Sequence, residues 1–358
     1  MKKFILLALL FGLTASISGC RHSFALSISK KADGGIYCIS GEESKFTTAL
    51  PTVNYLISGS RYYYATSNRN PRSTDQNGAV TVLAKVHFPH CTPGILQSVS
   101  VQGKTPCHLT LSPDEKFLYT ANYSSGDISE FRLKDGKIAA PPRLIPHSGK
   151  SITPRQKSPH PHFTGFSPDG KQLFVCDLGT DEIFIYNYSS DKGLLLPYAE
   201  KLKLPAGSGP RHLVFAPDGK TLYTANELSS TSSSFVKSGN TWKLHKTIST
   251  LEEKSTVRNS PGAIKITEDG KFFFITNRGH NSIAFFETAP DGNFNLLKAV
   301  PSPGNFPSDI ILLDGEKRLA VSHLKSGTVH FFKFDSKAKT LTAEPQNLSV
   351  KQAIGLCR

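Results

Sequence analysis

The sequence predicts an all-β fold: a seven-bladed β-propeller of four-stranded antiparallel blades, forming one domain over residues 21–358. Three observations predict this fold. A turn built from Pro, Asp and Gly recurs at a period of about fifty residues, which is typical of propeller repeats. Runs rich in β-branched and aromatic residues flank each turn. The chain has 28 Gly and 23 Pro but one Met and few long amphipathic runs, which argues against a helical bundle.

The first twenty residues have the pattern of a targeting segment. Lys2 and Lys3 precede an apolar run, residues 4–13, that is too short to span a bilayer as a stable anchor. Ile17-Ser18-Gly19-Cys20 then resembles a lipobox. We therefore expect a signal peptide over residues 1–20, lipidation of Cys20 and export, because two acyl chains hold a protein stably on a membrane. The residue after Cys20 is Arg21, and the absence of Asp at this position favours anchoring on the periplasmic side of the outer membrane. The alternative is an ordinary signal peptide with an incidental Cys20.

The net charge of the chain is +14, but its Lys and Arg residues are scattered along the sequence. No recognised nucleic-acid-binding motif is present, so we expect no nucleic-acid partner. A basic surface of this kind either keeps a protein soluble or attracts an anionic small molecule into a pocket. No later stretch is long and apolar enough for a transmembrane helix, so we expect membrane contact only through the lipid. We also expect a monomer.

Five cysteines follow Cys20, an odd number that leaves at least one free unless it pairs between chains. They are Cys38, Cys91, Cys107, Cys176 and Cys357. Their spacing fits no zinc pattern, and we expect neither a metal site nor a cofactor. An oxidising compartment permits a disulfide. Cys38 and Cys357 lie near opposite chain ends, so a bond between them would clamp a closed ring, whereas Cys107 and Cys176 are expected as small buried residues in strands.

Each repeat unit has the pattern of four strands. In the unit that contains Phe166-Ser167-Pro168-Asp169-Gly170, Pro presets one turn dihedral and Gly accepts a positive φ. A second apolar strand follows at residues 173–177, a short polar turn comes next, and a third strand is expected at 183–188. A fourth, more polar strand closes the blade. The equivalent turn aspartates are Asp114, Asp169, Asp218, Asp269 and Asp314.

Closure of the ring requires strands from both chain ends. A degenerate copy of the repeat at residues 53–86 brings the number of complete units to six. Residues 24–29 and 35–40 have the pattern of strands, and the C-terminal residues 352–358 can supply the last one. A shared seventh blade would remove an exposed sheet edge, since both termini would pair in it. The alternative is a ring of six blades.

Alignment of the repeats on their turn aspartate separates structural positions from variable ones. Proline stands eight residues before the aspartate, at Pro106, Pro161, Pro210 and Pro261. Asn or Asp stands eight residues after it, at Asn122, Asp177, Asn226 and Asn277. Such side chains commonly hold turns by bonding the backbone, so we expect these positions to be structural.

Two positions vary in a way that packing does not require. Seven residues before the aspartate stand Cys107, His162, Arg211 and Gly262, and nine after it stand Tyr123, Leu178, Glu227 and Arg278. One position begins a strand and the other ends its antiparallel neighbour, so both lie at the same end of a blade. Ring closure would gather them around one channel mouth. The alternative to a pocket is a solvated rim, but a pocket needs a few converging polar groups of this kind.

The same residues carry a family resemblance. The motifs are Ser158-Pro159-His160-Pro161-His162, Gly209-Pro210-Arg211-His212, Asn226-Glu227-Leu228-Ser229-Ser230, Asn277-Arg278-Gly279-His280 and Pro106-Cys107-His108-Leu109. Together they resemble the seven-bladed lactonase family, which includes propeller 6-phosphogluconolactonases and a fungal muconate-lactonising enzyme. The resemblance implies an active site of His162, Arg211, Glu227 and Arg278. His160, His108, Asn226 and His280 are the candidate substrate-binding residues.

The chemistry of lactone hydrolysis suits these residue types. Glu227 or His162 could take a proton from water, while Arg211 and Arg278 could hold an oxyanion and a substrate phosphate or carboxylate. No Gly-x-Ser-x-Gly motif indicates a serine hydrolase. We expect a metal-independent hydrolase of an anionic lactone, 6-phosphogluconolactone or a related aldonolactone, although export argues against a phosphosugar. The alternatives are a non-catalytic exported propeller that binds a sugar or a protein partner, and a lactonising cyclase of the same family.

Overall fold

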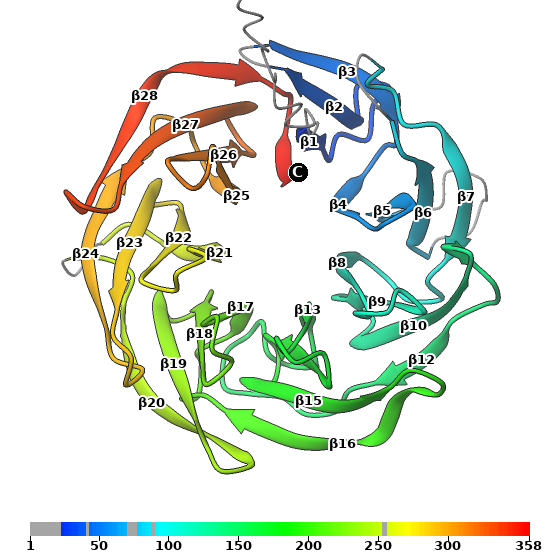
Figure 1. Ribbon diagram of the computed structural model, residues 1–358, viewed down its shortest axis with the longest axis horizontal. Coiled ribbons are helices and arrows are strands. Elements are labelled where there is room, and N and C mark those ends of the chain that lie inside the picture. Colours follow the sequence, from blue (N-terminus) through cyan, green and yellow to red (C-terminus); the bar gives the residue numbers. More distant parts are fainter. Residues whose placement is uncertain (1–22, 41–42, 70–76, 87–89, 253–255) are drawn as a thin grey trace, which may run out of the picture.

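Seven blades surround a central channel in the computed structural model (Figure 1). The structure describes residues 23–40, 43–69, 77–86, 90–252 and 256–358. The expected signal peptide and the lipobox cysteine Cys20 lie outside these residues. No helix of the described chain is long and apolar enough to cross a membrane.

The blades are numbered here in the order of their repeats, with the shared blade last. Blade 1 contains β4 (Val53–Ser58), β5 (Tyr62–Ser67), β6 (Ala79–Ala84) and β7 (Ile95–Ser100). Blade 2 contains β8 (Pro106–Leu111), β9 (Phe117–Asn122), β10 (Asp127–Lys134), β11 (Lys137–Ile138) and β12 (Arg143–Pro146). Blade 3 contains β13 (Pro161–Phe166), β14 (Gln172–Asp177), β15 (Glu182–Ser189) and β16 (Gly193–Lys203). Blade 4 contains β17 (Pro210–Phe215), β18 (Thr221–Asn226), β19 (Thr231–Ser238) and β20 (Thr241–Ser249).

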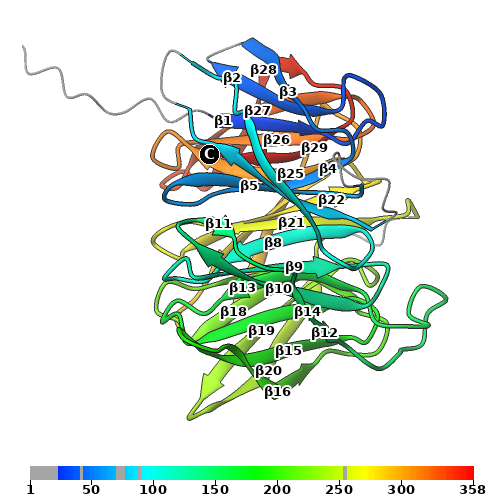
Figure 2. The same ribbon diagram turned by 90° about the vertical axis from the view of Figure 1, so that its right-hand side faces the viewer.

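The remaining blades complete the ring. Blade 5 contains β21 (Ser260–Ile266), β22 (Phe272–Arg278), β23 (Ser282–Thr288) and β24 (Phe294–Pro301). Blade 6 contains β25 (Pro307–Leu313), β26 (Arg318–His323), β27 (Thr328–Asp335) and β28 (Thr340–Ser349). Blade 7 contains β29 (Ala353–Cys357), β1 (Ser23–Ser27), β2 (Gly35–Ser40) and β3 (Glu43–Ala49), in that order across the sheet. All strand pairings of the described residues are antiparallel, so the predicted seven-bladed ring, closed by strands of both chain ends, is confirmed (Figure 1). Figure 2 shows the same blades from the side.

The predicted turns form as their residue types require. In blade 3, Asp169 Oδ1 accepts the Lys171 backbone N–H at 3.1 Å, and Gly170 adopts a φ of +70°. The backbone N–H groups of Lys116, Lys220 and Lys271 make the same bond to the preceding turn aspartates. The buried Asn and Asp side chains at the ends of the second strands are structural as well. Asp177 accepts the His160 and Gly179 N–H groups, and Asn277 donates to the Thr250 carbonyl.

A β-bulge at the start of each innermost strand determines what faces the channel. In β13 the register shifts between Pro161 and Phe163, and in β17 between Pro210 and His212, which leaves His162 and Arg211 without a partner across the ladder. A bulge re-aims the extra side chain relative to its neighbours. The equivalent shifts in blades 1, 2 and 6 leave Asn54, Cys107 and Ser308, and all five of these residues line one central cavity.

Packing between blades supports this geometry, since each hydrophobic cluster joins neighbouring sheets. One cluster interleaves Phe274 and Phe285 of blade 5 with Phe334 of blade 6, and their ring centroids lie 5.1–5.6 Å apart. Such aromatic pairs contribute about 0.5–1.5 kcal/mol beyond the area they bury. The blades therefore form a rigid frame for the side chains at the channel mouth.

The predicted disulfide between Cys38 and Cys357 is wrong. Phe24 of β1 pairs with Cys38 on one side and with Cys357 on the other, so the two cysteines are separated by a whole strand. Two strand spacings amount to about 9.6 Å, beyond the reach of a disulfide. Cys38 instead bonds Cys91, which follows blade 1 strand β6, with Cα atoms 6.0 Å apart. Among the described cysteines, Cys107, Cys176 and Cys357 are not disulfide-bonded. Cys176 is buried as expected, whereas Cys107 is partly exposed.

Candidate active site

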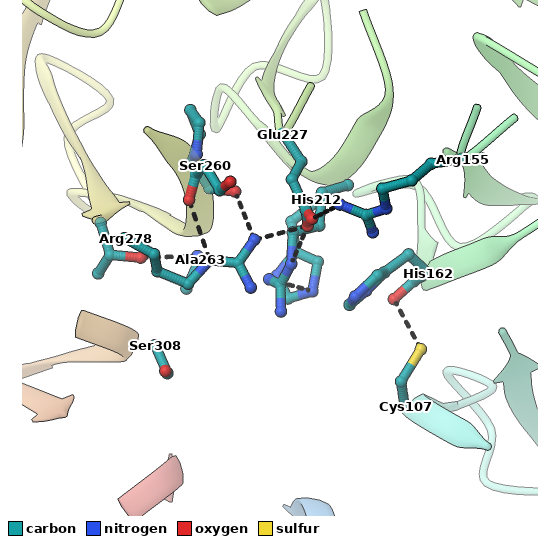
Figure 3. A network of polar contacts seen from close by, with 12 residues as sticks. Cys107, Arg155, His162, His212, Glu227, Ser260, Ala263, Arg278 and Ser308 are labelled. Carbon is teal, nitrogen blue, oxygen red and sulfur yellow. Dashed lines mark hydrogen bonds and ion pairs between the residues drawn. The ribbon is translucent and has the colours of Figure 1, made fainter. Parts of the chain in front are cut away.

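The Glu227 carboxylate lies in a cage of three arginines at the channel mouth (Figure 3). Glu227 directly follows β18, and its backbone N–H bonds the Gly209 carbonyl at 2.8 Å, which fixes the start of the side chain. Its oxygens lie 2.5 Å from Arg278 Nη2, 2.6 Å from Arg155 Nη1 and 3.2 Å from Arg211 Nε. We call these four residues the arginine cage.

Burial and charge together decide the protonation of Glu227. Its side chain is only 6% exposed, against 12% for Arg278, 10% for Arg211 and 39% for Arg155. Burial alone would raise the pKa of Glu227, but the positive charges of Arg278 and Arg211 outweigh it and hold the pKa below its usual value. Glu227 is therefore a stable carboxylate and a weak base, suited to orienting guanidinium groups.

His162 occupies the bulge of β13 on the neighbouring blade. Its ring centroid lies 5.7 Å from that of Tyr123 and 5.3 Å from that of His212. Within the described chain, His162 Nδ1 is buried without a hydrogen-bond partner. Burial and the positive charge of Arg211 lower the pKa of His162 well below 6.5. The imidazole is therefore neutral at neutral pH and able to accept a proton.

Arg211 combines contacts to the cage with a position in the central cavity. Its Nη1 lies 3.1 Å from His212 Nε2 and its Nε faces Glu227. Among the described residues no hydrogen bond uses its Nη2 donors, which can therefore bind a ligand. Burial and the nearby Arg278 lower the pKa of Arg211 to about 10, which leaves the guanidinium charged at neutral pH. Burial also raises the pKa of the neighbouring Cys107 thiol to about 12, so that thiol is not poised as a nucleophile.

Two cavities meet at the arginine cage. The channel cavity, of about 160 Å³, is lined by Asn54, Tyr55, Cys107, His162, Arg211, His212, Ser308, Asp309 and Ile354. The outer cavity, of about 360 Å³, is lined by Arg155, Glu227, Arg258, Ser260, Arg278, Gly279, Phe306 and Lys325. The ion pair between Arg211 and Glu227 joins one cavity to the other. Among the described residues, no three His, Cys, Asp or Glu side chains are grouped so that they could hold a metal ion.

The fold agrees with what comparison with known proteins shows. A profile of the family described as "Lactonase, 7-bladed beta-propeller" matches residues 30–356. The chain belongs to this lactonase family. It is 29% identical over 334 residues to the 6-phosphogluconolactonase of Bacillus subtilis, covering 88% of this chain and 94% of that one.

Solved structures of the lactonase family superpose closely on this chain. The periplasmic gluconolactonase of Pseudomonas aeruginosa matches with a TM-score of 0.85 and 25% identity, covering 94% of this chain and 98% of that one. A protein of Bacteroides fragilis, described as a candidate 6-phosphogluconolactonase, matches with a TM-score of 0.85 and 27% identity, covering 96% and 98%.

The four residues expected to be catalytic come together at the channel mouth. Those expected to bind substrate do not gather there in the same way. His108 is buried between Tyr55 and Phe163, with ring centroids 4.2 and 4.5 Å away, and lines neither cavity. Asn226 is fully buried and bonds Thr231 and Ser233 of its own blade.

The two remaining histidines are held by neighbouring residues. His160 Nδ1 lies 2.8 Å from the Tyr123 carbonyl oxygen, and its ring stacks on Tyr123 with centroids 4.5 Å apart. His280 Nδ1 lies 2.9 Å from Ser282 Oγ. His160 thus supports Tyr123 beside His162, and neither histidine lines the two cavities.

Arg155 is the member of the cage that the sequence did not indicate. It lies in the connection between β12 and β13, where it bonds Glu227 and, at 2.9 Å, the Tyr123 hydroxyl. The adjacent Gln156 anchors this connection by donating to the Leu178 carbonyl and to Asp181. Repeat alignment cannot find Arg155 because the segment has no counterpart in other blades. Its length was the available signal, since long ordered loops beside a pocket often carry function.

Proposed function

We propose that this protein is an exported lactonase that hydrolyses an anionic sugar lactone, 6-phosphogluconolactone or a related aldonolactone, without a metal ion. The observation that carries the proposal is the pairing of two unlike groups at one mouth. A neutral imidazole, His162, stands beside a charged guanidinium, Arg211, whose orientation is fixed by the Glu227 carboxylate. Base and oxyanion donor are the two groups that ester hydrolysis needs.

In the proposed reaction, His162 takes a proton from water as its oxygen attacks the lactone carbonyl carbon. The carbonyl oxygen becomes an oxyanion held by the Nη2 donors of Arg211. When the intermediate collapses, the bond between the carbonyl carbon and the ring oxygen breaks. The ring oxygen takes the proton from His162 and becomes a hydroxyl. The product is a hydroxy acid, which releases its carboxyl proton to solvent.

Glu227 and Arg278 act as positioning residues in this scheme. Arg278 is committed to the Ser260 carbonyl through Nε at 2.9 Å, and to the Pro261 carbonyl and Glu227 through Nη2. Glu227 in turn holds Arg211, and its lowered pKa makes it a weak base. Metal independence is proposed because the one carboxylate of the cage is already neutralised by guanidinium groups, which repel a divalent cation.

Export is supported by two features of different kinds. Residues 1–20 have the pattern of a lipoprotein signal peptide. The Cys38–Cys91 disulfide is the second, because such bonds persist in oxidising compartments and are rare in the cytosol. The Pseudomonas aeruginosa relative is itself described as periplasmic.

The test measures the opening of a panel of lactones, with acid release monitored by a pH indicator in weak buffer. The panel contains 6-phosphoglucono-δ-lactone, glucono-δ-lactone and an aromatic lactone, each with a no-enzyme reaction for the spontaneous rate. We expect opening of at least one sugar lactone well above the spontaneous rate, with and without a chelator. Rates equal to spontaneous hydrolysis throughout would refute the proposal. Binding of the sugar acids without turnover would then favour a non-catalytic propeller.

A further inference from the structure

The lining of the outer cavity carries more positive charge than the Glu227 carboxylate neutralises. Its lining includes four cations, Arg155, Arg258, Arg278 and Lys325, but one carboxylate, Glu227. Arg155 and Arg278 are both paired with that carboxylate. Arg258 and Lys325 are exposed and make no ion pair within the described residues. Two cations that have no counter-ion among the described residues, in one concave wall, create a positive potential that attracts anions.

The walls that carry these two cations are well fixed. Lys325 lies in the turn between β26 and β27, and its backbone N–H bonds the Asn305 carbonyl at 3.2 Å. Its Nζ stands 4.8 Å from the Phe306 ring centroid, while Arg278 Cζ stands 5.5 Å from the same ring. Phe306 is held in the left-handed region with a φ of +66°, and its N–H bonds Asn281 Oδ1 at 2.8 Å. A bulky residue in this conformation is strained and persists only when its surroundings hold it.

Arg258 is placed by a close backbone approach. Gly279, with a φ of +101°, packs against the Arg258 carbonyl oxygen so tightly that a Cβ atom would lie 2.1 Å from it. The next residue, Asn259, is buried and bonds Thr250 and Asn277. Arg258 is thereby held beside Arg278, whose Nε and Nη2 groups already contact Glu227 and two backbone carbonyls.

We propose that Arg258 and Lys325 form a subsite for a second anionic group of the substrate, a phosphate or carboxylate remote from the lactone ring. The ring itself would lie in the channel cavity beside His162 and Arg211. The two residues would therefore determine the preference for anionic over neutral lactones. Guanidinium and ammonium groups bind such oxyanions by charge-assisted hydrogen bonds. This inference rests on the proposed lactonase function for the place of the ring.

The test compares substrates with and without the remote anion. kcat/KM is measured at fixed ionic strength for 6-phosphoglucono-δ-lactone, for a lactone carrying a carboxylate, and for neutral glucono-δ-lactone. The variant is R258Q/K325Q. The matched control is K243Q/K298Q, which removes the same charge from exposed lysines on the outer strands β20 and β24. Fixed ionic strength is needed because surface potentials are screened by salt.

We expect R258Q/K325Q to lower the ratio of kcat/KM for an anionic lactone to that for the neutral one by about 10- to 100-fold. The control should leave this ratio unchanged. The anionic lactone whose ratio falls more identifies the group that the subsite prefers. An unchanged ratio in R258Q/K325Q, or an equal fall in K243Q/K298Q, would overturn the proposal.

A binding arm separates failure of this subsite from failure of the lactonase function. If the wild-type protein opens no lactone, calorimetric titration with 6-phosphogluconate and with gluconate still reports on the anion. Tighter binding of the phosphorylated acid that is lost in R258Q/K325Q supports the subsite without catalysis. Equal binding of the two acids, or a preference that survives in R258Q/K325Q, overturns it.

Discussion

Replacing Glu227 by Gln should destabilise the protein strongly, although the change is isosteric. The carboxylate is 6% exposed and contacts Arg278 and Arg211, which are 12% and 10% exposed. Glu227→Gln leaves both guanidinium groups nearly buried, close together and without a counter-charge. Removing one partner of a buried ion pair costs about 3–5 kcal/mol. Arg155 adds little, because it is 39% exposed and such pairs contribute at most about 1 kcal/mol.

This loss translates into a measurable change in melting temperature. With an unfolding entropy of about 2.1 cal/mol/K per residue, a loss of about 3–5 kcal/mol lowers the Tm of a chain of this length by about 4–7 °C. Thermal unfolding followed by circular dichroism at pH 7 measures it. The matched control is Glu182→Gln, which breaks a pair with the single, partly exposed Lys201 and should cost about 1 kcal/mol or less.

The sign of the pH dependence follows from the lowered pKa of Glu227. The carboxylate stabilises the folded state fully above its unfolded pKa of about 4.3, and this contribution is lost as pH falls toward the folded pKa. The gap between wild type and Glu227→Gln should therefore be constant at pH 6–8 and narrow below about pH 4. Adding Arg278→Gln to the variant should restore part of the stability, since like charges are then removed. A Tm within about 1 °C of wild type at pH 7 would refute the charged cage.

Three further predictions follow from the site and the frame. Because burial and Arg211 lower the pKa of His162 well below 6.5, kcat/KM should stay flat from pH 8 through 6.5 and fall only at lower pH; an acid limb centred at 6.5 or above would contradict this. Arg155→Gln should lower kcat/KM by about tenfold, because its bonds to Glu227 and Tyr123 are lost. It should lower the free energy of unfolding by less than about 1 kcal/mol, since Arg155 is partly exposed. Unfolding and kinetics measured on one sample separate the two effects. Reducing the Cys38–Cys91 disulfide, which spans 53 residues, should destabilise the fold by about 2–4 kcal/mol, and a C38S/C91S variant insensitive to reductant is the control. Equal melting of the oxidised and reduced wild type would contradict that expectation.

Much of the ring could be predicted from the sequence because a propeller repeats its local chemistry. Turn aspartates such as Asp169 make the same backbone bond in successive blades, so a single alignment locates the second strand of each of these blades. The same alignment located His162, Arg211, Glu227 and Arg278 at one end of the blades. Their convergence follows from ring closure, which repetition itself implies.

Features outside the repeat could not be predicted in this way. Arg155 belongs to a connection that only one blade has, so no periodic signal marks it. The pairing of Cys38 depended on strand order within blade 7: β1 lies between the strands of Cys38 and Cys357, and nearness to the chain ends does not reveal that. Asn226 adjoins Glu227 in sequence, yet strand alternation turns it into the blade, where it bonds Ser233.

The most direct test of the account is the rate of 6-phosphoglucono-δ-lactone opening by His162→Gln and Arg211→Gln beside wild type. Loss of a general base costs about 10²–10⁴ in rate, and loss of an oxyanion donor about 10²–10³. We predict that both variants fold, that the wild-type protein opens the lactone well above the spontaneous rate, and that each variant loses at least about 100-fold in kcat. Folded variants that open the lactone as fast as wild type would contradict a catalytic site at this channel mouth.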